Sequence, residues 1–346
     1  MWRFRRKEGG GTATEELPPE ATIDWDGTTA ELEQEIDRLA AANHAQGDPE
    51  TERRLLRLRH LAGMRALEEA DAHPEFATPD TGALPASDGL PEFRRADLTP
   101  GLLRAAILRD GCVLVRGLID RDAAQRFAER IDRAFAERER DEAGEGLYEE
   151  FVPNRHSKGV LERQWIKMGG GVLAADSPPI AFEMLELFRA ADLGPLVDGY
   201  LGERALISVH KTTLRKATPD VPGAWHQDGA FMGPVRSLNL WLSLSRCGDV
   251  APGLDLVPRR LDDLVATQTD DAVLDMQVSQ RMAEQAAGDR PIVRPIFEPG
   301  DALLFDELFL HQTASDPSMP NPRYAIENWF FGSSSFPADY APIAPW

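Results

Sequence analysis

Two pairs of a histidine and a carboxylate separated by one residue could supply neighbouring metal ligands in this chain. Chance alone predicts about one such pair at this composition, so position has to decide between them. His73 and Glu75 flank a proline in a segment without strand pattern, where we expect no ordered metal site. His226 and Asp228 lie between two predicted strands. In extended backbone, residues i and i+2 point to the same side, so this imidazole and this carboxylate can converge on one ion.

A third metal ligand is predicted at His311, which follows a glycine turn and an apolar strand. Two histidines and one carboxylate form the facial triad that leaves adjacent coordination positions open on ferrous iron. Open positions allow a cosubstrate and oxygen to bind side by side. Because a structural zinc site is normally closed by four protein ligands, a set of three favours a catalytic metal. We therefore predict His226, Asp228 and His311 as catalytic metal ligands.

An arginine, Arg323, lies twelve residues beyond His311 at the start of a predicted strand. Period-two alternation places Ala325, Glu327 and Trp329 on the same face of that strand. A guanidinium group can bind a carboxylate through two parallel hydrogen bonds. A strand arginine is often an ion-pair partner, but its place after the distal histidine favours a pocket beside the metal. We predict that Arg323 binds a carboxylate there.

The order His226-x-Asp228, His311, Arg323 resembles that of the phytanoyl-CoA dioxygenase family of iron(II)- and 2-oxoglutarate-dependent oxygenases. The resemblance covers residues 92–332 and leaves residues 1–91 outside. It is most specific in Trp225-His-Gln-Asp-Gly229 and Gly300-Asp-Ala-Leu-Leu-Phe-Asp-Glu-Leu-Phe-Leu-His311. It implies a double-stranded β-helix, a cupin-like jelly roll flanked by helices.

The resemblance also implies cofactors and a role for each matching residue. The cofactor set would be Fe(II), 2-oxoglutarate as cosubstrate and O2, with His226, Asp228 and His311 as iron ligands. The residues expected to bind the cosubstrate are Arg323, Thr313, Trp241, Thr212 and Lys167. Arg323 would hold the distal carboxylate of 2-oxoglutarate, and the Thr313 hydroxyl would lie near that carboxylate. For Trp241 and Thr212, ordinary strand packing is the alternative interpretation.

The reaction implied by the resemblance is the oxidation of an unactivated C–H bond, coupled to decarboxylation of 2-oxoglutarate to succinate. Hydroxylation of a small organic molecule or acyl thioester is the default outcome. Desaturation, ring closure and epimerisation begin with the same step and stay open. Halogenation is disfavoured, because related halogenases replace the carboxylate ligand with a small residue and Asp228 is present.

Two rival functions remain open. One is a non-oxidative cupin metalloenzyme, an isomerase or lyase, which would need neither Arg323 nor 2-oxoglutarate. The other is a catalytically silent metal-binding interaction protein. The chain also departs from the family in Val257-Pro-Arg-Arg-Leu261, where relatives commonly carry a Pro-Gly-Ser-His turn. Since that loop borders the substrate side, the family does not imply the substrate.

The elements that must position these residues change character along the chain. Helical periodicity fits 121–140, 180–192 and 194–201, and another helix starts at Thr99-Pro100, where the threonine caps the helix and the proline occupies its first turn. Alternation then indicates strands, and in 235–246 leucines share one face while Asn239, Trp241 and Ser243 share the other. The predicted strands are 112–116, 205–216, 235–246, 254–257, 292–297, 301–306 and 323–331, with a helical insertion at 261–287. This order indicates an α+β protein.

The N-terminal part is predicted to consist of a flexible arm (1–27), a helical hairpin (28–73) and a linker (74–91), before the oxygenase domain (92–346). Thr28 and Glu31 fit a capping box, and Gly47 ends the first helix. A packed accessory hairpin is the expected arrangement. The hairpin is also a candidate surface for a homo-oligomer.

Composition restricts the classes of partner. The formal net charge of −20 repels nucleic acid, and no stretch reaches the roughly 18 apolar residues of a membrane-spanning helix. The basic start lacks the apolar run of a signal peptide, so we expect a cytoplasmic protein. The two cysteines match neither a disulfide framework nor a zinc spacing. We expect a small-molecule substrate, no nucleic acid and no membrane.

Overall fold

The computed structural model describes residues 25–346 apart from 71–72, 87–89, 141–143, 145, 154–158, 222, 234 and 271. Its strands are β1 (Glu92–Arg94), β2 (Cys112–Arg116), β3 (Gly171–Leu173), β4 (Ala205–Ala217), β5 (Ser237–Ser243), β6 (Gly253–Leu256), β7 (Ala302–Phe305), β8 (His311–Ala314), β9 (Arg323–Gly332) and β10 (Pro342–Ile343). One large sheet has the order β1-β2-β7-β5-β9-β4-β10, with β3 also paired to β4, and β6 pairs with β8 in a second sheet.

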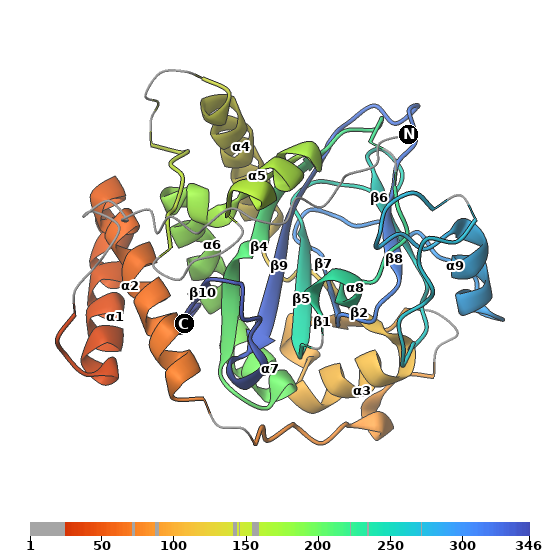
Figure 1. Ribbon diagram of the computed structural model, residues 1–346, viewed down its shortest axis with the longest axis horizontal. Coiled ribbons are helices and arrows are strands. Elements are labelled where there is room, and N and C mark those ends of the chain that lie inside the picture. The colour runs from red at the N-terminus through yellow and green to blue at the C-terminus, as the bar shows by residue number, and fades with distance from the viewer. Residues whose placement is uncertain are drawn as a thin grey trace, which may run out of the picture.

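Helices surround these sheets (Figure 1). They are α1 (Thr29–Gln46), α2 (Pro49–Glu68), α3 (Pro100–Asp110), α4 (Arg121–Arg138), α5 (Gly159–Met168), α6 (Pro178–Ala190), α7 (Leu193–Leu201), α8 (Gly229–Met232) and α9 (Gln280–Ala287). One large apolar cluster joins α3, α4, α6 and α7 to the large sheet. These helices therefore cover one face of that sheet and leave its other face to a cavity.

Strand β5 shows why the two faces of the large sheet differ. Its neighbours β7 and β9 both run antiparallel to it, so its side chains alternate strictly between the faces. Leu238, Leu240 and Leu242 are buried against the helices. Asn239 and Trp241 point to the opposite side, where they line a cavity. The leucine face and the polar face predicted for this strand are confirmed.

The second sheet is extended by isolated bridges that close the jelly roll. His226 pairs with His311, Trp225 with Val278, and Leu256 with Val293. Residues of both sheets line the cavity, which places it between them. The predicted double-stranded β-helix with flanking helices and an N-terminal hairpin is the fold of the described residues.

Two predicted elements were wrong in extent. Residues 292–297 form only two isolated bridges, because Pro291 and Pro295 have no N–H to donate to a ladder. The insertion at 261–287 is helical only in α9, and Ser279 caps that helix. Before it, the Gln277 side chain accepts hydrogen bonds from the backbone of Val273 and Leu274, a local alternative to helical pairing.

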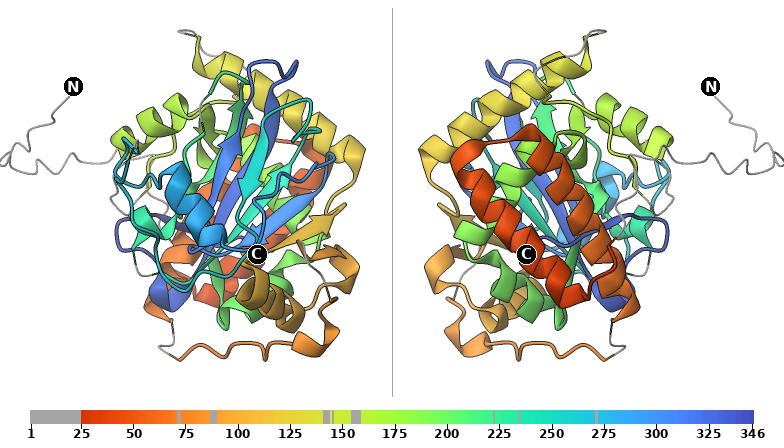
Figure 2. Two further views of the ribbon diagram at one scale, coloured as in Figure 1. Left: turned by 90° about the vertical axis from the view of Figure 1, so that its right-hand side faces the viewer. Right: turned by 90° about the vertical axis from the view of Figure 1, so that its left-hand side faces the viewer.

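The N-terminal hairpin consists of α1 and α2, which lie side by side in Figure 2. The predicted capping box at Thr28 and Glu31 is present. Gly47 adopts φ 61° directly after α1, in the left-handed region that glycine enters at little cost. The predicted arm falls mostly on residues outside those that the structure describes.

The hairpin packs on the rest of the protein through α2. Buried Arg59 donates from Nη1 to the carbonyl oxygens of Ala344 and Pro345, each at 3.1 Å. Leu58 is fully buried in a cluster that also contains Leu206 of β4. The hairpin therefore shares its core with the large sheet. Its role as an oligomer surface and the predicted domain boundaries stay predictions.

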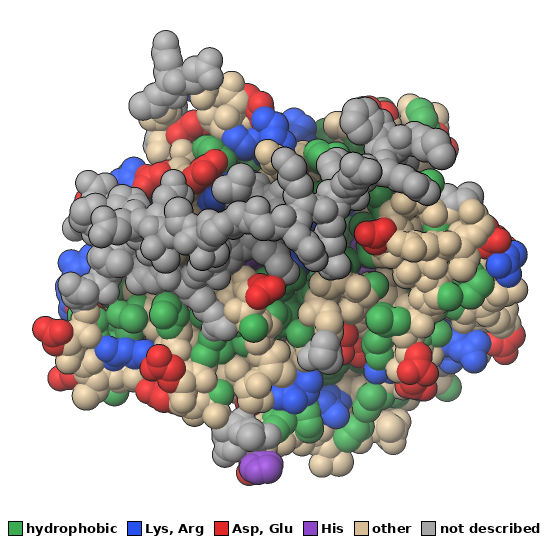
Figure 3. All heavy atoms as spheres, in the orientation of Figure 1, with side chains coloured by type: hydrophobic (Ala, Val, Ile, Leu, Met, Phe, Trp, Pro, Cys, Tyr) green, Lys and Arg blue, Asp and Glu red, His purple; other side chains and the backbone are tan. Residues whose placement is uncertain are grey.

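Acidic and basic side chains are interspersed on the face of the molecule shown in Figure 3. Exposed ion pairs elsewhere in the structure include Arg121–Glu298 and Arg246–Asp249. In the parts of the chain that the structure describes, no helix combines the length and apolar character needed to cross a membrane.

The contact between hairpin and sheet can be tested with a buried leucine and an exposed one. Leu58→Ala should lower the free energy of unfolding by about 2–5 kcal/mol, because it leaves a cavity in a fully buried cluster. The matched change Leu108→Ala, on a side chain that is 47% exposed, should cost less than about 1 kcal/mol. Chemical denaturation measures both. Equal small losses would show that the hairpin adds little to global stability.

Candidate active site

The two predicted histidine ligands face each other across an antiparallel bridge. The backbone N of His226 donates to the carbonyl oxygen of His311 at 3.0 Å, and the N of His311 donates back to His226 at 3.2 Å. Directly paired residues in an antiparallel arrangement project their side chains to the same face. The two imidazole centroids are consequently 4.5 Å apart. Asp228 follows two residues later, immediately before α8.

The three side chains form one cluster of potential ligand atoms. The ligand atoms of His226, Asp228 and His311 all lie within 4.8 Å of one another. The Asp228 carboxylate is 4.0 Å from Nε2 of His226 and 3.9 Å from Nε2 of His311. Asp228 and His311 are buried, whereas His226 is partly open to the cavity. This donor set fits a divalent first-row metal with open coordination positions.

Backbone carbonyls set the orientation of both imidazoles. Nδ1 of His226 lies 2.7 Å from the carbonyl oxygen of Ala224, and Nδ1 of His311 lies 3.1 Å from that of Phe309. Because a carbonyl oxygen only accepts, each Nδ1 carries the proton. Each Nε2 then presents its lone pair toward Asp228, which is the arrangement that a metal requires.

Burial shifts the pKa values of two of the three ligands, His311 and Asp228. It lowers the pKa of His311 to about 3, with His226 adding to the effect, so His311 is neutral at neutral pH. Burial also raises the pKa of Asp228 to about 6, against the opposing influence of His226. A cation at the centre of the cluster would offset this cost of burying the carboxylate. The cluster therefore fits a metal ion better than it fits a proton.

The cavity beside the cluster has a volume of about 310 Å³ and contains a buried cation, Arg323. Nη1 of Arg323 donates to the carbonyl oxygen of Gly253 at 3.1 Å, while its buried Nε has no hydrogen-bond partner among the residues that the structure describes. The guanidinium carbon lies 5.3 Å from the ring centre of Trp241. Burial lowers the pKa of Arg323. A bound carboxylate would supply the missing acceptor and the missing charge.

The structure brings some of the other predicted cosubstrate residues to this cavity. Trp241 and Thr313 both line it. Thr212 does not, because its hydroxyl lies on the other face of β4 and contacts the Ser208 carbonyl oxygen and Asn328 Oδ1, each at 2.9 Å. The adjacent Thr213 lines the cavity instead. Alternation along the strand makes only one of these two threonines available.

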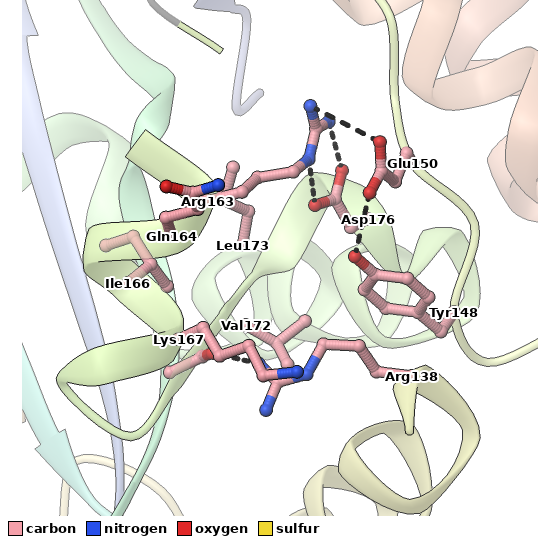
Figure 4. Close-up of a pocket in the computed structure, with 11 residues that line it drawn as sticks. Arg138, Tyr148, Glu150, Arg163, Gln164, Ile166, Lys167, Val172, Leu173 and Asp176 are labelled. Atoms are coloured by element: carbon pink, nitrogen blue, oxygen red, sulfur yellow. Dashed lines mark hydrogen bonds and ion pairs between the residues drawn. The ribbon is translucent and has the colours of Figure 1, made fainter. Parts of the chain in front are cut away.

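Lys167 lies in another cavity, of about 270 Å³, which is also lined by Arg138 and Arg163 (Figure 4). Its ammonium group is 2.9 Å from Oε2 of Glu139, and the side chain is largely exposed. Ile166, one residue earlier on α5, lines both cavities. The structure therefore places Lys167 near the active site without bringing it into the metal cavity.

An ion pair in the cavity wall was not among the predicted site residues. Arg215 of β4 donates from Nε to Glu327 of β9 at 2.8 Å, and both line the cavity. Although burial acts in the opposite direction, Arg215 holds the pKa of Glu327 at about 2. Alternation from Arg323 already places Glu327 on this face. Its partner could be found only once the pairing of β4 with β9 is known.

Metal binding provides a direct test of the cluster. His311→Ala should abolish tight binding of Fe(II), because only two protein ligands would remain. The control is His44→Ala, a histidine on the exposed side of α1. Metal content after dialysis, together with circular dichroism, measures the effect in each variant. Retention of stoichiometric iron by a folded His311→Ala protein would refute the assignment.

Several solved structures are distantly similar to this fold. EctD from S. alaskensis with 2-oxoglutarate and 5-hydroxyectoine is 17% identical, with a TM-score of 0.47, covering 77% of this chain and 85% of that chain. The non-heme alpha ketoglutarate dependent carbocyclase SnoK from nogalamycin biosynthesis is 13% identical, with a TM-score of 0.45 and coverage of 70% and 87%. The epimerase SnoN in complex with Fe3+, alpha ketoglutarate and nogalamycin RO is 19% identical, with a TM-score of 0.45 and coverage of 67% and 83%.

The family of this protein is shown by a match to a family model, since the similarity to the solved structures is too distant to show it. No curated protein matches the chain significantly. The phytanoyl-CoA dioxygenase (PhyH) model matches residues 107–319, more than half of the 346 residues. The matched range contains the His226, Asp228 and His311 cluster, which is consistent with the iron site of the family's 2-oxoglutarate-dependent enzymes. The chain belongs to the phytanoyl-CoA dioxygenase family.

Proposed function

We propose that this protein is an Fe(II)- and 2-oxoglutarate-dependent dioxygenase that hydroxylates a small organic molecule or acyl thioester. One observation carries the proposal. A three-ligand metal cluster and a buried arginine share one cavity, and among the described residues none forms a salt bridge with that arginine, Arg323. The three-ligand cluster is suited to bind a cation, and the buried arginine is suited to bind an anion. A chelating dicarboxylate is the ligand that can satisfy both.

The residues of the chain divide the work of binding. His226, Asp228 and His311 would hold iron on one side, and their backbone bridge and carbonyl contacts keep the ligand atoms in place. Arg323 would bind the distal carboxylate of 2-oxoglutarate through its fork of N–H donors. Trp241 would form the wall between these two ends of the cosubstrate. These contacts are preorganised, so little ordering remains for the binding step.

The cofactor chemistry of this class couples decarboxylation of 2-oxoglutarate to succinate and CO2 with insertion of one oxygen atom of O2 into a C–H bond. The protein contributes a site largely shielded from water, because Asp228, His311 and Arg323 are all buried. Shielding favours coupled turnover over side reactions with solvent.

The alternative functions differ in whether they need Arg323 and open coordination positions on the metal. A non-oxidative cupin reaction would leave Arg323 buried without a ligand, and a silent binding protein would need neither Arg323 nor open metal positions. Desaturation, ring closure and epimerisation would use the same cofactors as hydroxylation. Product analysis after a substrate is found separates them.

Succinate formation tests the class of reaction. Purified protein with Fe(II), 2-oxoglutarate and O2 should release succinate slowly without substrate and faster with a substrate. Release should stop in the iron-free His311→Ala variant, because the triad is broken. Succinate from labelled 2-oxoglutarate is measured by mass spectrometry. If the iron-loaded protein forms no succinate with any member of a broad substrate panel, the oxygenase proposal fails.

The role of Arg323 can be tested separately. Arg323→Ala should weaken 2-oxoglutarate binding roughly 10- to 150-fold, since a buried charged hydrogen bond contributes about 1.5–3 kcal/mol. Arg323→Lys keeps the charge but loses the fork, so its loss should be smaller. Iron affinity should change little. The matched surface control is Arg121→Ala, and calorimetry measures each dissociation constant. An unaltered constant in Arg323→Ala would make this arginine structural.

A further inference from the structure

A second unsatisfied polar group lies in the wall of the metal cavity. Asn239, on β5, is 1% exposed and lines the cavity, yet no described residue forms a hydrogen bond with its Oδ1. A buried acceptor without a donor costs free energy, so native structures leave few of them. The few that line a ligand cavity are candidates for completion by the ligand. Asn239 therefore marks a position where a donor group is expected.

The strand register places Asn239 close to the metal cluster. Its cross-strand partners are Phe305 of β7 and Trp329 of β9, and all three line the cavity. The Phe305 ring packs against His311, with 4.8 Å between the ring centres. Trp241, beside Arg323, is two residues further along β5. Asn239 is thus two residues from Trp241 along β5 and is paired with Phe305, the residue whose ring contacts the distal histidine.

Asn328 shows that an unpaired amide alone does not define a site. Its buried Nδ2 also lacks a partner in the described part of the chain, but its Oδ1 accepts a hydrogen bond from Thr212. Asn328 pairs with Leu240 and so lies on the helix-covered face of the sheet. It does not line the metal cavity. Of these two buried asparagines, only Asn239 can meet a ligand there.

Part of the cavity wall near the triad is apolar, although the ammonium group of Lys211 lies 4.5 Å from the ring centre of Phe231. Phe231 of α8 is 42% exposed, and its ring lies nearly parallel to that of His226 at 6.5 Å. Ile166 of α5 and Met276 line the same cavity. These side chains come from segments outside the two sheets. A ligand that reaches Asn239 would therefore also contact apolar surface.

We propose that the substrate has an apolar body, packed on Phe231, Ile166 and Met276, and carries a hydroxyl or amine group that donates a hydrogen bond to Oδ1 of Asn239. This inference rests on the proposed function, because it takes the triad as the reacting centre. Asn239 would then act as a specificity-determining residue that fixes which end of the substrate approaches the metal.

The experiment uses three probes with the same apolar body, 1-indanol, 1-aminoindane and 1-methoxyindane. Only the methyl ether lacks a donor. Calorimetry with iron- and 2-oxoglutarate-loaded protein should show that the alcohol or the amine binds about five- to tenfold more tightly than the ether, as one hydrogen bond would give. Comparing the dissociation constants of the alcohol and the amine shows whether the site prefers a hydroxyl or an amine donor.

Two variants, each of which replaces a buried asparagine by the similarly branched leucine, show which residue causes the preference. Asn239→Leu should bring the ratio of dissociation constants to about one, and Asn328→Leu should leave the ratio as in the wild type. A preference that survives in folded Asn239→Leu would overturn the proposal. So would equal binding of all three probes by the wild type, or no binding, which would mean that Asn239 meets only water or cosubstrate.

The proposed function has its own readout in the same samples. Anaerobic Fe(II) and 2-oxoglutarate should give a visible charge-transfer band in the wild type and in both asparagine variants. Loss of the band from every protein, with the donor preference intact, would reject the cofactors while keeping Asn239 as a ligand contact. An intact band without the preference would reject only the role of Asn239.

Discussion

The active site depends on one short antiparallel contact, the pair of backbone hydrogen bonds between His226 and His311. These bonds join segments that are 85 residues apart in the 346-residue chain, and they fix the two imidazoles on one face. A slip of one residue in this register would turn one imidazole away from the other. The jelly roll supplies that register by pairing β6 with β8 and by bridging Leu256 to Val293. Closure of the second sheet is thus a requirement of the metal cluster.

Local alternation was sufficient to predict much of the fold and of the candidate site. The pattern of β5 separated the leucine face from the face of Asn239 and Trp241, and the structure has the same division. Thr212, which the resemblance implied as a cosubstrate residue, shows what alternation cannot decide. A register irregularity in β4 between Ile207 and Thr212 shifts the alternation, so Thr213 faces the cavity. No local signal in the sequence reveals this bulge, because it appears only when β4 pairs with β9.

The remaining differences concern segments whose positions depend on contacts distant in sequence. Lys167 lies on α5, and the site that this helix reaches depends on how it packs against β3 and β4. The partner of Glu327 was invisible for the same reason, since Arg215 is 112 residues away. The insertion before α9 is held by side-chain to backbone contacts such as those of Gln227 with Asp263 and Val265. Periodicity describes one face of one element and carries no information on such contacts.

The charged side chains in the cavity include one carboxylate and one guanidinium group, those of Asp228 and Arg323, that carry opposite charges and do not pair with each other. Arg215 and Glu327 form an ion pair at 2.8 Å, so their charges offset each other. Among the described residues, Asp228 forms no ion pair with a lysine or arginine, and Arg323 forms none with a carboxylate. Lys211, the other cation that lines the cavity, has its ammonium group 4.5 Å from the ring centre of Phe231. Burying the charge of Asp228 or of Arg323 alone is costly in a medium of low polarity. An anion that binds Arg323 while chelating a metal at Asp228 removes both penalties in one event, so the two binding sites should be energetically coupled.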